Sequence, residues 1–154
     1  MKSNPKALRI NSAWAGSAGT LLKQHTSGTN RSVPVGCVCE VHDRYAVMPN
    51  WLVYVKPLPG GAVACLTINL GETVLSAANG APTVSIAELL ETVQNASSTT
   101  TGEADSASPP SAFSTADVWT SEPGPNVSVA RPWSAAGLTP HNSSFVVFTP
   151  VGQF

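Results

Sequence analysis

Only 11% of this chain is charged, although 42% of it is hydrophobic and it contains 12 glycines and 13 prolines. An ordinary soluble domain carries about 25% charged residues. Because a surface helix needs many Lys and Glu side chains on its polar face, a chain with so few charges cannot cover several helices. Strands and loops can present Ser, Thr, Asn and Pro to water instead. The composition therefore predicts a β-rich domain.

The length and the charge distribution predict one domain preceded by a basic segment. A chain of 154 residues is long enough for one core that buries about 70% of the unfolded surface. Residues 1–31 contain five basic residues and no acidic one, whereas residues 72–122 contain seven acidic residues and no basic one. We interpret residues 1–31 as a basic arm or linker and residues 32–154 as a single β-rich domain.

Neither direct nucleic-acid binding nor membrane insertion is expected. The net charge of −1 gives no electrostatic reason for the chain to bind nucleic acid. The longest uncharged stretch, residues 132–154, is interrupted by Pro140 and Pro150 and is rich in polar residues. Such a stretch does not span a bilayer.

Short alternating stretches predict an antiparallel β-sandwich or a small barrel. From Ser32 to His42, apolar and other residues alternate, which is typical of a half-buried strand. Residues 51–56 and 62–70 are expected to form a hairpin around the turn Pro57–Gly61, with Ala64, Leu66 and Ile68 on one face of the second strand. Further short strands are expected at residues 73–76, 118–120, 127–131 and 144–151.

One short helix is expected at about residues 86–94. Ser85 and Glu88 have the spacing of a capping box, and apolar residues follow at helical intervals. Asn95 suits the left-handed position that closes a helix. Residues 96–114 are rich in Ser, Thr, Ala and Pro and are predicted to form a flexible exposed loop.

The three cysteines predict neither a metal site nor any cofactor. Cys37 and Cys39 would share the apolar face of their strand, while His42 would point to the other face. A zinc site needs four convergent ligands. We therefore expect Cys37, Cys39 and Cys65 to be small, reduced core residues.

The sequence contains no clear motif of a catalytic site. No nucleophile elbow of the G-x-S-x-G type is present. A hydrolytic site would need His25, His42 or His141 to meet a serine and a carboxylate through folding. We predict no enzymatic activity, and a small serine-type hydrolase remains the alternative.

The candidate contact residues are aromatic and polar side chains near turns. Trp133 follows Arg131-Pro132 and precedes a Ser-Ala-Ala-Gly loop, so we expect it near the surface. Two roles remain open for Trp133, a structural one and that of a platform for a receptor or a glycan. The other candidate contacts are His141, Asn142 and Trp119.

The basic start, the low-charge body rich in Ser, Thr, Ala, Pro and Gly, and the exposed loop at residues 96–114 resemble capsid projecting domains. Such domains occur in small non-enveloped positive-strand RNA viruses of the nodavirus, tetravirus and sinaivirus kind. The resemblance implies a virion-surface domain that attaches to a host receptor or glycan. It also implies self-association as a dimer or trimer and contact with other capsid subunits. A lectin-like or other cellular or phage binding module, secreted or on a cell surface, is the alternative.

Overall fold

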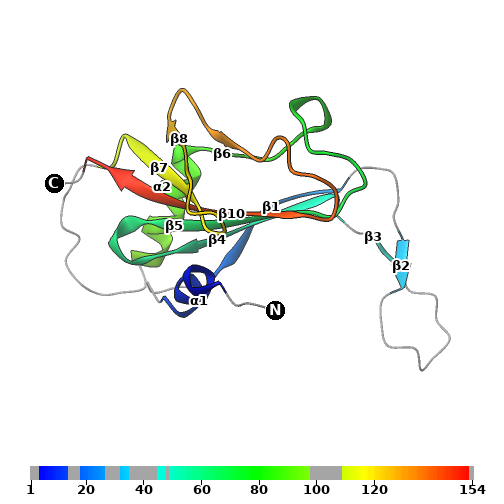
Figure 1. The fold of residues 1–154 in the computed structure, drawn as a ribbon, viewed down its shortest axis with the longest axis horizontal. Coiled ribbons are helices and arrows are strands. Elements are labelled where there is room, and N and C mark those ends of the chain that lie inside the picture. Colours follow the sequence, from blue (N-terminus) through cyan, green and yellow to red (C-terminus); the bar gives the residue numbers. More distant parts are fainter. Residues whose placement is uncertain are drawn as a thin grey trace.

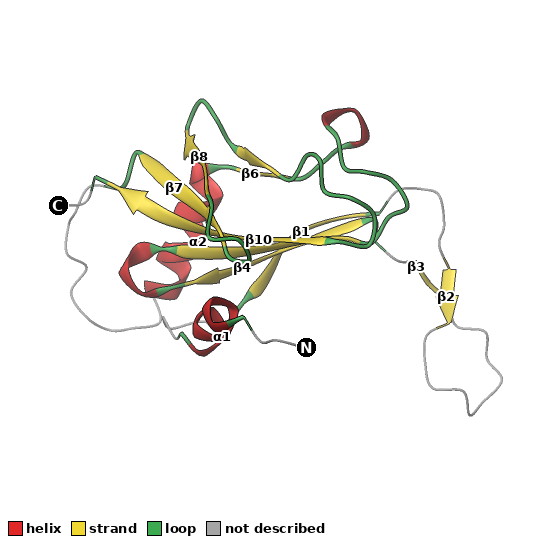
Figure 2. Cartoon of the chain, in the orientation of Figure 1, coloured by secondary structure: helices red, strands yellow, loops and turns green. Residues whose placement is uncertain are grey.

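The computed structural model describes residues 4–13, 18–26, 32–34, 45–47, 49–97 and 109–152. Strands and loops make up most of this part of the chain (Figure 2). The expectations for Cys37, Cys39 and His42 lie outside the described residues. The helices are α1 (Pro5–Ser12) and α2 (Ile86–Ser97), with 3-10 turns η1 (Pro59–Gly61) and η2 (Ala77–Asn79). The strands are β1 (Thr20–His25), β2 (Ser32–Pro34), β3 (Tyr45–Val47), β4 (Trp51–Pro57), β5 (Val63–Asn69), β6 (Thr83–Val84), β7 (Ala112–Asp117), β8 (Pro123–Ser128), β9 (Trp133–Ser134) and β10 (Ser143–Val151).

A six-stranded antiparallel sheet in the order β1-β4-β5-β10-β7-β8 forms the centre of the molecule (Figure 1). The predicted hairpin is confirmed: β4 pairs with β5 from Trp51 opposite Asn69 to Pro57 opposite Val63. The turn between them needs glycine, because Gly60 and Gly61 have φ angles of 76° and 72°. The smaller sheets are β2-β3 and β6-β9.

One face of the large sheet carries the hydrophobic core. Helix α2 and the β6-β9 pair cover this face and contribute side chains to the same buried cluster. The buried cluster contains Trp51, Val53, Val55, Val63, Cys65, Leu75, Val84, Ile86, Leu89, Phe113, Val127, Trp133, Ala135, Val146 and Phe148. The predicted fold class, mostly β in a sandwich-like arrangement with a short helix, is confirmed.

The segment expected to be an arm contributes to the fold. Strand β1 pairs with β4, from Thr20 opposite Val55 to His25 opposite Trp51, and forms one edge of the sheet. The pairing shifts register between Leu21 and Lys23. Such a bulge breaks the period-two pattern, which is why alternation did not reveal this strand. The expected boundary at residue 31 therefore does not separate β1 from the sheet.

Helix α2 begins as predicted but continues further. The capping box is present: the Ser85 amide donates to Glu88 Oε2 at 2.8 Å, and the Glu88 amide donates to Ser85 Oγ at 3.4 Å. The end expected at Asn95 is wrong, because the helix runs on to Ser97 and buries Ala96. The predicted loop at 96–114 is also too long, since β7 begins at Ala112. Its central residues, 98–108, lie outside the described part of the chain.

Two of the short predicted strands are turns or loops instead. At residues 118–120 the chain turns, because the Asp117 carboxylate accepts hydrogen bonds from the amides of Trp119 and Thr120, both at 2.7 Å. At residues 73–76 the backbone bonds to a loop: the Leu75 amide donates to the Leu138 carbonyl at 3.0 Å.

No helix among the described residues is both long and apolar enough to cross a membrane.

Candidate functional site

The two candidate tryptophans lie on opposite faces of the large sheet. Trp133 is only 8% exposed, and its ring meets the buried Phe148 edge-on at a centroid distance of 6.0 Å. The expectation that Trp133 lies near the surface is therefore wrong. Trp119 is 50% exposed and contacts Phe145 at 5.8 Å. Phe145 and Phe148 are three residues apart on β10 and so point to opposite faces.

His141 and Asn142 lie in the exposed loop before β10. His141 has a φ of 53°, and its Nε2 lies 3.1 Å from Glu72 Oε2. Both side chains are more than half exposed. The side-chain Nδ2 of Asn142 donates to Thr139 Oγ1 at 3.2 Å. The predicted contact residues thus do not form one site, because Trp133 is in the core while the others are exposed.

Asn69, which sequence reasoning missed, holds the loops at this end of the sheet. Its side chain is fully buried at the end of β5. The side-chain nitrogen lies 2.9–3.1 Å from the carbonyl oxygens of Thr73, Leu138 and Thr139. Its Oδ1 accepts from the Gly71 amide at 3.0 Å. The only feature of the sequence that could have pointed to Asn69 is its position as a polar residue at the end of an apolar strand, two residues before Gly71.

Of the three histidines that could act as bases, His25 and His141 belong to the described residues, and both have other partners. The His25 ring stacks on Trp51 with centroids 5.6 Å apart. His141 contacts the carboxylate of Glu72, so neither contact is with a serine hydroxyl. Among the residues that the structure describes, no group of three or more His, Cys, Asp or Glu side chains could hold a metal ion.

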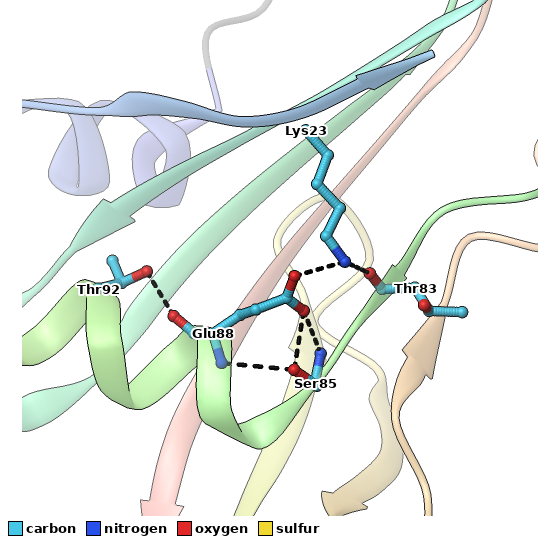
Figure 3. Close-up of polar contacts among 5 residues, drawn as sticks. All are labelled: Lys23, Thr83, Ser85, Glu88 and Thr92. Atoms are coloured by element: carbon cyan, nitrogen blue, oxygen red, sulfur yellow. Dashed lines mark hydrogen bonds and ion pairs between the residues drawn. The ribbon is translucent and has the colours of Figure 1, made fainter.

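A polar cluster ties β1 and β6 to the start of α2 (Figure 3). Lys23 Nζ lies 2.6 Å from Glu88 Oε1 and donates to the Thr83 carbonyl at 2.6 Å. The other carboxylate oxygen of Glu88 accepts from the Ser85 amide and hydroxyl, both at 2.8 Å. Both oxygens of Glu88 are thus engaged within the fold.

The titration of this region fits a structural role. Partial burial acts to raise the pKa of Glu88, but the hydrogen bonds from Lys23 and Ser85 outweigh it and hold the pKa below its usual value. Burial raises the pKa of the nearby Cys65 thiol to about 12. Since the thiolate is the nucleophilic form, Cys65 is inert at neutral pH.

Replacing Glu88 by Gln is expected to lower the free energy of unfolding by about 1–2 kcal/mol at pH 7, through a weaker helix cap and a lost ion pair. Because the folded-state pKa is lowered, the carboxylate stabilises the fold above the unfolded pKa, about 4.3, and this contribution disappears as pH falls through the folded value. The difference between wild type and variant, measured by urea unfolding, should therefore shrink below about pH 4.

Glu91→Gln is the matched control, because Glu91 is an exposed carboxylate on the same helix. We expect it to change the stability by less than about 0.5 kcal/mol. A Glu88→Gln effect as small as that of the control would contradict the role assigned to the cluster.

The sheet face opposite the core is also apolar. Tyr54, Leu66 and Phe145 are register partners on β4, β5 and β10 and form a row across the sheet. We call this surface the α1-side face and define it by Tyr54, Lys56, Ala64, Leu66, Phe145 and Val147. Tyr54 is exposed, and Leu66, Phe145 and Val147 are half-buried. The apolar row is therefore only partly covered.

Helix α1 is the cover of this face. It lies on the side of the sheet opposite β6 (Figure 1), and none of its eight residues is buried. Polar contacts hold its two ends: Asn4 donates to the Val118 carbonyl at 3.2 Å, and Lys56 Nζ donates to the carbonyls of Ile10 and Asn11 at 2.9 and 2.7 Å. Two shallow apolar hollows of about 270 Å³ each flank the helix.

Comparison with known proteins gives a likeness in fold alone. No protein-family model and no curated protein matches the chain. A GH27 β-L-arabinopyranosidase from Geobacillus stearothermophilus is 13% identical, with a TM-score of 0.59 over 99% of this chain and 23% of that chain. The α-galactosidase I from Mortierella vinacea is 12% identical, with a TM-score of 0.56 over 96% of this chain and 27% of that chain. The chain thus spans about a quarter of the length of these glycosidases.

Proposed function

We propose that this chain is a non-catalytic β-module of a larger protein of the glycoside hydrolase kind, where it supports a separate catalytic part. The observation that carries the proposal is the α1-side face, an apolar sheet surface with one short helix as cover. An exposed apolar patch on a folded domain is typical of a surface that contacts another protein.

Two further observations support the proposal. The likeness in fold extends over nearly the whole of this chain but over only a quarter of two glycosidases. Among the residues that the structure describes, Glu88 and Cys65 have shifted pKa values, and both are held in structural contacts. A general acid or nucleophile needs a titratable group that can reach a substrate.

The proposal is tested on the native polypeptide and on the isolated 154-residue chain. Antibodies against the module should detect a native polypeptide several times heavier than 15.9 kDa. The isolated chain should not hydrolyse aryl arabinopyranosides or aryl galactosides. Hydrolysis by the isolated chain that is lost in His25→Ala or His141→Ala, with an unchanged melting temperature, would overturn the non-catalytic assignment.

The roles implied by the resemblance to capsid projecting domains, and the lectin-like alternative, stay predictions. A projecting domain on a virion, with self-association and host attachment, and a lectin-like module both require exposed contact residues. Trp119, His141 and Asn142 are exposed, whereas Trp133 is not. Any attachment surface would therefore have to be built without Trp133.

A further inference from the structure

We propose that the α1-side face is the docking surface on which the remainder of the larger polypeptide packs, and that this remainder presents an apolar centre with an acidic rim. The inference rests on the proposed function and names the surface through which the module acts.

The first argument is the difference between the two faces of one sheet. On the core face, Val53, Val63 and Phe148 have no exposed surface. On the α1-side face, Tyr54 is 37% exposed, and the adjoining Trp119 is 50% exposed. A sheet with two apolar faces needs a layer on each of them. Only one face has a complete layer among the described residues.

The second argument is that α1 is a weak cover. A helix of eight residues is well below the length at which helices are stable on their own in water. Its apolar Leu8 is 56% exposed. The helix leaves a hollow on the β4–β5 side and another beside β7 and β10, each about 270 Å³. Apolar side chains of a partner can enter both hollows without displacing α1.

The third argument is charge. Lys6 and Arg9 are exposed on α1, and no acidic residue occurs on this helix. Lys6, Arg9 and Asp117 all border the hollow beside β7 and β10. The Oδ1 of Asp117 accepts hydrogen bonds from two backbone amides of its own turn. The rim is therefore predominantly basic, which favours an acidic partner surface.

This charge pattern also decides between two occupants. A second copy of the chain would bring two basic rims together, and like charges at an interface cost binding energy. The glycosidases with this fold carry about three quarters of their length outside the matched part. A larger domain of the same polypeptide therefore fits the face better than a second copy does.

The test is hydroxyl-radical footprinting of the native polypeptide and of the isolated 154-residue chain. Oxidation of Leu8, Tyr54 and Trp119 should be at least about threefold slower in the native polypeptide, because packing removes solvent from these side chains. Val74 and Val129 are the internal controls: they are 47% and 83% exposed, and neither belongs to the α1-side face. Their oxidation should be unchanged.

A second arm uses variants of the native polypeptide. Trp119→Lys should raise the oxidation of Leu8 and Tyr54 to the rate in the isolated chain, whereas Val129→Lys should leave it low. Both positions are exposed, so we expect both variants to fold. A long native polypeptide with equal oxidation of Leu8, Tyr54 and Trp119 in both forms would overturn this inference and leave the proposed function standing. A native polypeptide of only 154 residues would overturn both.

Discussion

Replacing Asn69 by Asp is expected to lower the free energy of unfolding by about 3–5 kcal/mol at pH 7, because it places an unpaired charge in a buried site. The side-chain nitrogen of Asn69 lies within hydrogen-bond distance of three carbonyl oxygens. In the variant, a carboxylate oxygen would face the same carbonyl oxygens and could not donate to them. Buried polar groups that lose their partners cost more than the hydrogen bonds themselves.

The effect should be localised in the two loops that Asn69 connects. Amide exchange is expected to speed up at Leu75 and Gly137, since their hydrogen bonds belong to these loops. Asn142→Asp provides the control, because Asn142 is an exposed amide in the same region. We expect the control to change the stability by less than about 0.5 kcal/mol. Equal stabilities for the two variants, measured by urea unfolding, would contradict the role of Asn69 in holding the two loops together.

Asn69 also shows where sequence reasoning reached its limit. The alternation from residue 62 to 70 places Ala64, Leu66 and Ile68 on one face, and these residues do share a face. The core, however, lies on the other face, where Cys65, Thr67 and Asn69 are almost fully buried. A period-two pattern identifies two faces but gives no way to tell a core from a docking surface when both carry apolar residues.

Local signals predicted local structure well. The hairpin of β4 and β5 depends on strand formers and on a Gly-Gly turn, and the start of α2 depends on Ser85 and Glu88. In each case the residues that carry the signal lie close together in the sequence, so a short stretch of sequence is enough to predict the element. The pairing of Lys23 with Glu88 spans 65 positions, and that of Asn69 with Leu138 spans 69. Such contacts are set by the fold as a whole.

Trp133→Ala is expected to lower the free energy of unfolding by about 3–5 kcal/mol, which is the usual cost of removing a large buried aromatic side chain. Trp133 pairs with Val84 in the β6-β9 sheet, and its ring packs on Phe148, which has no exposed surface. For a domain of this size, each kcal/mol lowers the melting temperature by about 2–4 °C. The expected loss is therefore about 10 °C, which thermal unfolding followed by circular dichroism can measure.

Trp119→Ala is the matched control for this prediction, because it removes the same side chain from the opposite face. Trp119 is half exposed and has an edge-on contact with Phe145, so its loss should cost less than about 1.5 kcal/mol in the isolated chain. If Trp119 contributed as much to the stability of the isolated chain as Trp133 does, the α1-side face would be a second core and not a docking surface. The difference in stability loss between Trp133→Ala and Trp119→Ala thus tests whether the core face stabilises the isolated chain more than the α1-side face does.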